Sequence, residues 1–320
     1  KAITPRKWEK TPPTLRGAID TTRVAGADWS PWSNIYGVSG EIFQSPSPRR
    51  FMELEARLVS QDPQVAATLD WLAVNFTDPL AARVVGEIYP TEVPPGQPAQ
   101  FSYFLKPEAS PSGFDRISIE ATTVPQFEAA FVNGERVDVV SELLDKGFRV
   151  LFPRRIRSRQ LVELRFSSPI YLQATRFDAF LEDSRNSEVR QLVDAGNATD
   201  GVESNTNVVS LPLNLDLLLN VDFSSRVVTP NGDGINDEIV VLTDVVNVLV
   251  PRLLRLRLYD LAGRQVSGRG ADVQAGPQQL SWDGRDDYGR LVPPGLYLLE
   301  LHIGGDASEQ RVRRVVSVVY

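Results

Sequence analysis

One stretch of the sequence combines residue types and spacing that could hold a metal ion. Residues 231–238 read Asn-Gly-Asp-Gly-Ile-Asn-Asp-Glu, so oxygen-bearing side chains are interleaved with glycines. Such a loop can wrap calcium, with side-chain oxygens from Asn231, Asp233 and Asp237 and the carbonyl oxygen of Ile235. It departs from an EF-hand, because no helix is expected on either side and no glutamate stands at the twelfth position. The alternative is a turn whose carboxylates accept hydrogen bonds from backbone amides.

The sequence offers no group of residues suited to catalysis. It has no cysteine and a single histidine, His302, which excludes thiolate nucleophiles and His-rich metal sites. His302 falls on the outward face of an expected strand, beside Glu300, where an exposed structural role outweighs a catalytic one. Neither a Gly-x-Ser-x-Gly motif nor a phosphate loop between a strand and a helix is present. We therefore expect a protein that is not an enzyme and binds no cofactor other than calcium.

Aromatic residues near the beginning of the chain could contact a partner. Trp29, Trp32 and Tyr36 could form a platform for sugar rings, although burial in a core or an interface is the commoner fate of tryptophan. Residues 1–14 hold three prolines and four basic side chains. This composition indicates either an extended basic arm lying on a partner, with Trp8 as its anchor, or a disordered terminus.

A cluster of arginines is the other candidate for partner binding. Four arginines occur within six residues and could bind an acidic partner or lipid headgroups. They suit a solvated hairpin better, because the run lies between two expected strands. The four are Arg154, Arg155, Arg157 and Arg159.

Composition limits the class of protein. The chain has 320 residues, a net charge of −7 and a pI near 5.0, so it lacks the basic surface that a nucleic-acid partner requires. No run of about 18 apolar residues is present to cross a membrane as a helix. The sequence begins at Lys1 without a signal-peptide pattern, and we expect a mature or fragmentary chain.

The elements expected to carry these residues are strands. Proline (23) and glycine (22) interrupt short apolar runs throughout, which is typical of an all-β chain. Asn133-Gly134 between two such runs predicts a two-residue hairpin, since both positions accept positive φ. The best helical candidate is short, at 188–193. We expect tandem β-sandwich domains: a basic arm (1–14), a partial jelly-roll-like module (15–79), an Ig-like sandwich (80–182), a linker or long loop (183–221) and a second Ig-like sandwich (222–320).

The last hundred residues carry a resemblance to a known family. Val228-Thr-Pro-Asn-Gly-Asp-Gly-Ile-Asn-Asp-Glu is followed by Leu256-Arg-Leu-Tyr-Asp-Leu-Ala-Gly-Arg and then by Leu280-Ser-Trp-Asp-Gly-Arg-Asp-Asp-Tyr-Gly. This order resembles the Ig-like domain of the flagellar hook-capping family. It is also similar to the C-terminal modules of bacterial secreted and surface proteins, including gliding and type IX secretion cargo. The resemblance covers 222–320 and implies a structural or sorting module without an active site.

The same region predicts where the second core lies. Trp282 is expected to fill the sandwich between two tight turns. In the strand that follows, alternate side chains are expected to point inward: Tyr297, Leu299, Leu301 and Ile303.

Residues 29–77 resemble the closing half of a jelly-roll, galactose-binding-like module of secreted bacterial proteins. The runs at 51–59 and 69–76 alternate as strands do.

Together these features predict a non-catalytic, extracytoplasmic structural or interaction subunit (periplasmic, surface-bound or secreted) that scaffolds a larger envelope assembly. Its partners would be other protein subunits. The alternatives are ancillary modules of a secreted hydrolase and a carbohydrate-binding or adhesion module that takes glycans.

Overall fold

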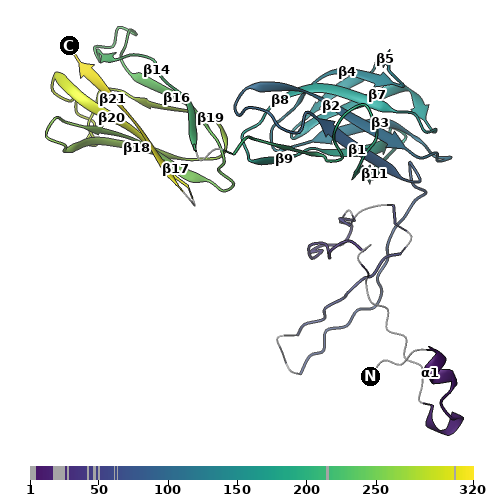
Figure 1. Ribbon diagram of the computed structural model, residues 1–320. Coiled ribbons are helices and arrows are strands. Elements are labelled where there is room, and N and C mark those ends of the chain that lie inside the picture. The colour runs from purple at the N-terminus through teal and green to yellow at the C-terminus, as the bar shows by residue number, and fades with distance from the viewer. Residues whose placement is uncertain are drawn as a thin grey trace. The chain divides into compact units, whose positions relative to one another are not determined.

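The fold is all-β, as the sequence predicts (Figure 1). The structure is a computed structural model that describes residues 5–16, 26, 29–41, 43–45, 48–49, 51–60, 62, 64–213, 216–305 and 308–320. Within these residues the only helical elements are the α-helix α1 (Pro5–Glu9) and one 3-10 turn (Pro13–Leu15). No described helix is long and apolar enough to cross a membrane.

The first sandwich packs two large sheets face to face. One sheet has the order β12-β1-β2-β8-β4-β5 and the other the order β11-β10-β3-β7-β6. The strands of the first sheet are β1 (Val84–Tyr89), β2 (Pro98–Pro107), β4 (Gln126–Val132), β5 (Glu135–Val137), β8 (Val162–Pro169) and β12 (Asp194–Ala195). Those of the second are β3 (Phe114–Glu120), β6 (Val140–Leu144), β7 (Gly147–Ile156), β10 (Asp178–Asp183) and β11 (Asn186–Leu192). A small sheet pairs β9 (Ala174–Arg176) with β13 (Val208–Ser210).

The core of this sandwich is aromatic. The ring of Phe166 lies 5.8 Å from that of Phe101, 5.5 Å from that of Phe148 and 5.4 Å from that of Phe177. Phe101, Phe148 and Phe166 come from inward positions of β2, β7 and β8, and Phe177 lies between β9 and β10. Burying such a side chain contributes about 1.5–3 kcal/mol, so this cluster is a main source of the domain's stability.

The hairpin predicted at Asn133-Gly134 is confirmed. These two residues have φ values of 52° and 81° and join β4 to β5, with Val132 paired to Glu135. Both positive φ values match the right-handed twist of the flanking strands, which is why an Asn-Gly pair is favoured here.

The second sandwich packs a three-stranded sheet on a five-stranded one. Their orders are β14-β16-β19 and β15-β21-β20-β17-β18. The smaller sheet consists of β14 (Leu218–Phe223), β16 (Ile239–Val245) and β19 (Gly276–Trp282). The larger consists of β15 (Val227–Val228), β17 (Arg252–Tyr259), β18 (Gln265–Val273), β20 (Gly295–Gly304) and β21 (Glu309–Val318).

The predicted core of the second sandwich is also confirmed. Trp282 is buried, and its indole nitrogen donates a hydrogen bond of 2.8 Å to the carbonyl oxygen of Arg285. The four alternate residues of β20 that were expected to point inward are buried: Tyr297, Leu299, Leu301 and Ile303.

Residues 183–221 differ from the expected linker or long loop. They supply β11, β12 and β13 to the first sandwich, and β14 begins the second sandwich at Leu218. The expected short helix at 188–193 lies largely in β11, where Leu192 pairs with Phe180 of β10. The ladder hydrogen bonds and the apolar contacts with β10 outweigh the weak local preference for helix.

The partial jelly-roll-like module expected over 15–79 contains no strand in its described residues. Residues 51–60 and 66–79 form no strand, and between them the amide of Val65 donates to the carbonyl oxygen of Asp62 in a turn (Figure 1). A strand exists only when a neighbouring strand accepts and donates its backbone hydrogen bonds, so alternation alone does not make one.

The arm expected to be extended is helical at its start. The turn α1 begins at Pro5, a position where the missing amide of proline costs nothing. The guanidinium of Arg16 lies 4.8 Å from the centre of the Trp8 ring and donates to the carbonyl oxygens of Glu9 and Thr11. Residues 1–4 of this arm lie outside the described residues.

Candidate functional site

The loop at 231–237 is a set of Asx turns. The two carboxylate oxygens of Asp237 accept hydrogen bonds of 2.7 Å from the amides of Gly232 and Gly234. Asp233 accepts the amide of Ile235 at 2.8 Å, and Asn231 accepts that of Asp233 at 3.0 Å. All four residues proposed as calcium ligands lie in one loop. Their oxygen atoms already accept hydrogen bonds from donors within the protein.

The electrostatics of this loop follow from those hydrogen bonds. The amides of Gly232 and Gly234 stabilise the charged carboxylate and lower the pKa of Asp237 below its usual range. The carbonyl oxygen of Ile235 accepts the hydroxyl of Thr229 at 2.8 Å. Among the described residues, no group of three or more His, Asp or Glu side chains is arranged to hold a metal ion. The loop therefore matches the amide-capping alternative, and calcium at this place remains a prediction.

The aromatic residues near the beginning of the chain are exposed. Trp29 and Trp32 keep 40% and 64% of their surface open to solvent. Tyr36 stacks on Phe43, with ring centres 6.4 Å apart and planes 15° from parallel. Within the described residues, the aromatic contact of Tyr36 is therefore to Phe43, and no ring contact joins it to either tryptophan to make the expected platform.

The arginine cluster is divided between two environments. Arg155 lies at the end of β7, nearly buried, and pairs with Asp115 and Asp183 while also donating to the carbonyl oxygens of Ser112 and Gly113. The remaining members of the cluster are exposed, as a solvated hairpin predicts: Arg154, Arg157 and Arg159. Arg155 thus forms ion pairs within the first sandwich, and little of its side chain is exposed for contact with a partner.

A charged sheet face in the second sandwich was missed by sequence reasoning. The strand register places Arg255 of β17, His302 of β20 and Arg311 of β21 in one row across the outer face of the five-stranded sheet. The adjacent row consists of Arg257, Glu300 and Arg313 in the same three strands. We call these six residues the arginine face.

Ion pairs organise part of the arginine face. Arg313 donates to Glu300 at 2.7 Å, and Arg257 lies 3.8 Å from the other carboxylate oxygen of Glu300. The imidazole nitrogen Nε2 of His302 lies 3.3 Å from Glu309, which also accepts Arg311 at 2.8 Å. His302 points outward as predicted, yet it is only 8% exposed, because the long side chains around it cover the ring.

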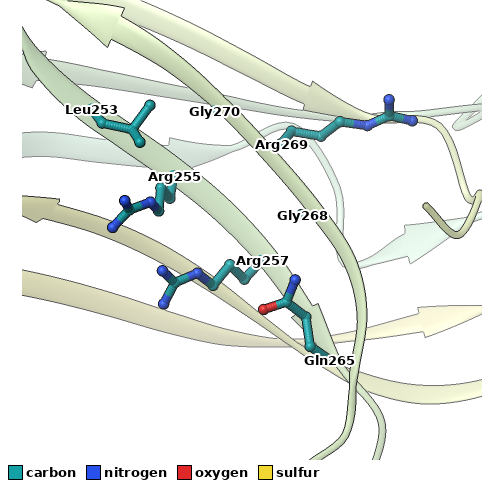
Figure 2. A pocket seen from close by; sticks show the side chains of 7 residues that line it. All are labelled: Leu253, Arg255, Arg257, Gln265, Gly268, Arg269 and Gly270. Carbon is teal, nitrogen blue, oxygen red and sulfur yellow. The ribbon is translucent and has the colours of Figure 1, made fainter.

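A shallow groove borders this face beside β18. Its volume is about 320 Å³, and it is lined by residues of β17 and β18 (Figure 2). Arg255 and Arg257 point to the same side of the sheet, and Arg269 points away from them (Figure 2). Gly270 and Gly268 stand opposite Arg255 and Arg257 in the strand register, and the side chain of Gln265, also of β18, lines the groove beside Gly268.

The signal for this face was present in the sequence. In β17 the arginines Arg255 and Arg257 alternate with leucines, and in β21 Arg311 and Arg313 stand on either side of Val312. The alternation shows that these arginines share an outward face within each strand. Which strands are neighbours, and in which register, does not follow from one sequence.

The described residues define an all-β chain with two sandwich domains, one of which presents an arginine-rich outer sheet. No protein-family model matches the sequence, and no curated protein matches it. The resemblance of residues 222–320 to the hook-capping family therefore remains a prediction.

Several solved structures are similar to parts of the chain at low identity. Latent PorU from Porphyromonas gingivalis is 14% identical over 71% of this chain and 18% of its own, with a TM-score of 0.29. The adhesin InvE from Yersinia pseudotuberculosis is 9% identical over 74% of this chain and 58% of its own, with a TM-score of 0.27. A beta-glucuronidase from Parabacteroides merdae is 12% identical over 68% of this chain and 28% of its own, with a TM-score of 0.23. At these TM-scores the function of those proteins cannot be assigned to this chain. The chain also spans less than two thirds of the length of each of them.

Proposed function

We propose that the chain is a non-catalytic, extracytoplasmic structural or interaction subunit that contributes surfaces to a larger protein assembly. The observation that carries this proposal is the exposure of apolar side chains along residues 51–76. Ten large apolar side chains in this segment are exposed, including Trp71 at 76% and Phe76 at 92%. A concentration of exposed apolar surface on this scale marks an interaction site.

The backbone of this segment supports the same proposal. Residues 51–59 and 69–76 alternate as strands do, yet neither run forms a strand among the described residues. Covering their apolar side chains and pairing their amides would stabilise the segment in two ways at once. A partner that presents a sheet with an apolar face meets both requirements.

The extracytoplasmic part of the proposal rests on residues 222–320, which resemble modules of secreted and surface proteins. Subcellular fractionation of the source cell with an antibody to the second sandwich tests it. Recovery from the cytosolic fraction alone would contradict this part of the proposal and leave the interaction role standing.

Native purification followed by mass spectrometry tests the interaction role. We expect a stable set of co-purifying proteins and protection of residues 51–76 from protease in the complex. The double variant Trp71→Ser and Phe76→Ser should lose these partners. A matched control, Leu261→Ser and Tyr288→Ser, removes two side chains of comparable exposure from the second sandwich and should retain them. Purification of the natural protein as a free monomer would overturn the proposal.

A carbohydrate-binding role is favoured by one observation, the exposure of Trp29 and Trp32. Glycan-array binding that is lost in Trp29→Ala or Trp32→Ala would establish it. Equal binding by the natural protein and both variants would exclude these two residues as the site.

A further inference from the structure

The arginine face has two guanidinium groups whose hydrogen-bonding capacity is largely unused. Arg313 and Arg311 have close carboxylate partners, at 2.7 and 2.8 Å. Arg255 has no ion pair or side-chain hydrogen bond within the described residues, and Arg257 has only the 3.8 Å contact with Glu300. Each guanidinium presents five N–H donors in a planar fork, so Arg255 and Arg257 together have many donors available to an anion.

Two glycines of β18, Gly268 and Gly270, line the groove beside these arginines. A Cβ atom at Gly270 would lie 3.1 Å from Cδ1 of Leu253, and one at Gly268 would lie 2.8 Å from Nε2 of Gln265. The side chains of Leu253 and Gln265 thus lie over the glycines at the two ends of the groove (Figure 2). Neither glycine has a side chain of its own, so the groove is bordered here by the flexible ends of Leu253 and Gln265.

We propose that this groove binds an extended peptide segment of a partner protein with acidic side chains at alternate positions. Arg255 and Arg257 are two residues apart on one strand, which separates them by about 6.8 Å. Acidic residues at positions i and i+2 of an extended peptide have the same separation and project to the same side. Each carboxylate can then accept two parallel hydrogen bonds from one guanidinium group. A single lysine cannot form this bidentate pair.

The surroundings of β18 show how such a peptide lies. The amide of Gly268 donates to Asp287 at 2.8 Å, and the carbonyl oxygen of Val266 accepts the amide of Asp287 at 3.3 Å. These two backbone groups on the free edge of the sheet are therefore occupied by the loop that carries Asp287. The peptide therefore lies along the outer face and not on the edge of the sheet, with its acidic side chains toward Arg255 and Arg257 of β17.

His302 contributes to the same surface. Its Nδ1 atom is buried and has no hydrogen-bond partner among the described residues. In the strand register His302 stands between Arg255 and Arg311. This inference goes beyond the proposed function and uses none of residues 51–76, so that either can fail without the other.

Nuclear magnetic resonance of the whole chain with a defined probe tests the proposal. The probe is the peptide Thr-Glu-Thr-Glu-Thr-Glu-Thr, and its matched control is Thr-Glu-Glu-Thr-Thr-Glu-Thr, which has the same composition but no glutamates at i and i+2. We expect the amide signals of Gly268 and Gly270 to shift with the first peptide and binding to weaken as salt is added. The control peptide should bind several-fold more weakly.

Variants identify the residues responsible. The double variant Arg255→Gln and Arg257→Gln should weaken binding about tenfold, since exposed charge-assisted pairs are individually modest. Arg136→Gln with Arg226→Gln makes the same change in net charge at exposed positions elsewhere and should leave binding unchanged. Equal weakening by both double variants, equal affinity for both peptides, or no shift at Gly268 and Gly270 would overturn the proposal. Tighter binding of polygalacturonate than of peptide at these amides would also overturn it, in favour of an acidic polysaccharide.

Discussion

The guanidinium of Arg155 lies 3.2 Å from the carboxylate of Asp115, and only 11% and 14% of these two side chains are exposed. Asp183 also pairs with Arg155. The three side chains join the ends of β7, β3 and β10, three adjacent strands of the first sandwich. A buried charge of this kind is stable only while its partners remain, which makes the site sensitive to truncation on either side.

Arg155→Ala should therefore destabilise the first sandwich. Removing Arg155 leaves the carboxylate of Asp115 with little solvent and no cation and leaves Asp183 with Arg185 alone, and the expected loss is about 3–5 kcal/mol. Arg154→Ala, at the neighbouring exposed position, should change the free energy of unfolding by no more than about 0.5 kcal/mol. Urea denaturation followed by circular dichroism measures both. Equal stability of the two variants would show that the ion pairs contribute little.

Acid should weaken the same region through Asp183. Burial raises the pKa of Asp183, but hydrogen bonds from Arg155 and Arg185 outweigh this effect and lower the pKa to about 2. Since the folded pKa lies below the unfolded one, the stabilising contribution is present above about pH 4 and is lost as the pH falls toward 2. Unfolding free energies across this interval should fall more steeply for the natural protein than for Asp183→Asn. Parallel pH profiles would contradict the assignment to Asp183.

Gly147 should not tolerate even a methyl group. A Cβ atom there would lie 1.8 Å from the carbonyl oxygen of Ile119, a backbone atom that cannot move without disrupting the pairing of β3 and β7. We expect Gly147→Ala to cost about 3 kcal/mol, at the upper end of overpacking effects. Gly304→Ala is the matched control, because nothing lies within 4 Å of its Cβ position. A melting temperature unchanged in both variants would contradict this expectation.

The loop at 231–237 gives a separate prediction. Asp237→Ala removes the acceptor of two backbone amides and should lower the melting temperature of the second sandwich only slightly, because water can replace the carboxylate at this exposed loop. A loop that only caps amides should give the same melting temperature in millimolar calcium and in a chelator. A calcium-dependent rise that disappears in Asp237→Asn would instead establish a calcium loop.

Sequence reasoning succeeded where a pattern is local. The Asn133-Gly134 turn, the burial of Trp282 and the inward residues of β20 depend on a few neighbouring positions, and the structure confirms them. It was less successful where partners are distant in the chain. The alternation at 51–59 predicts a strand, but the described chain supplies no neighbour for it. The arginine face likewise depends on the register of β17, β20 and β21, which no single strand encodes.

The position of β12 constrains how the first domain can form during synthesis. Val85 of β1 pairs with Asp194 of β12, so the two ends of the domain are neighbours in one sheet. The β1 edge stays open until the ribosome has released the chain well beyond residue 195. During that interval an unpaired strand edge is available to wrong partners. A nascent chain stalled at residue 182 should therefore recruit chaperones that a chain stalled after residue 213 does not.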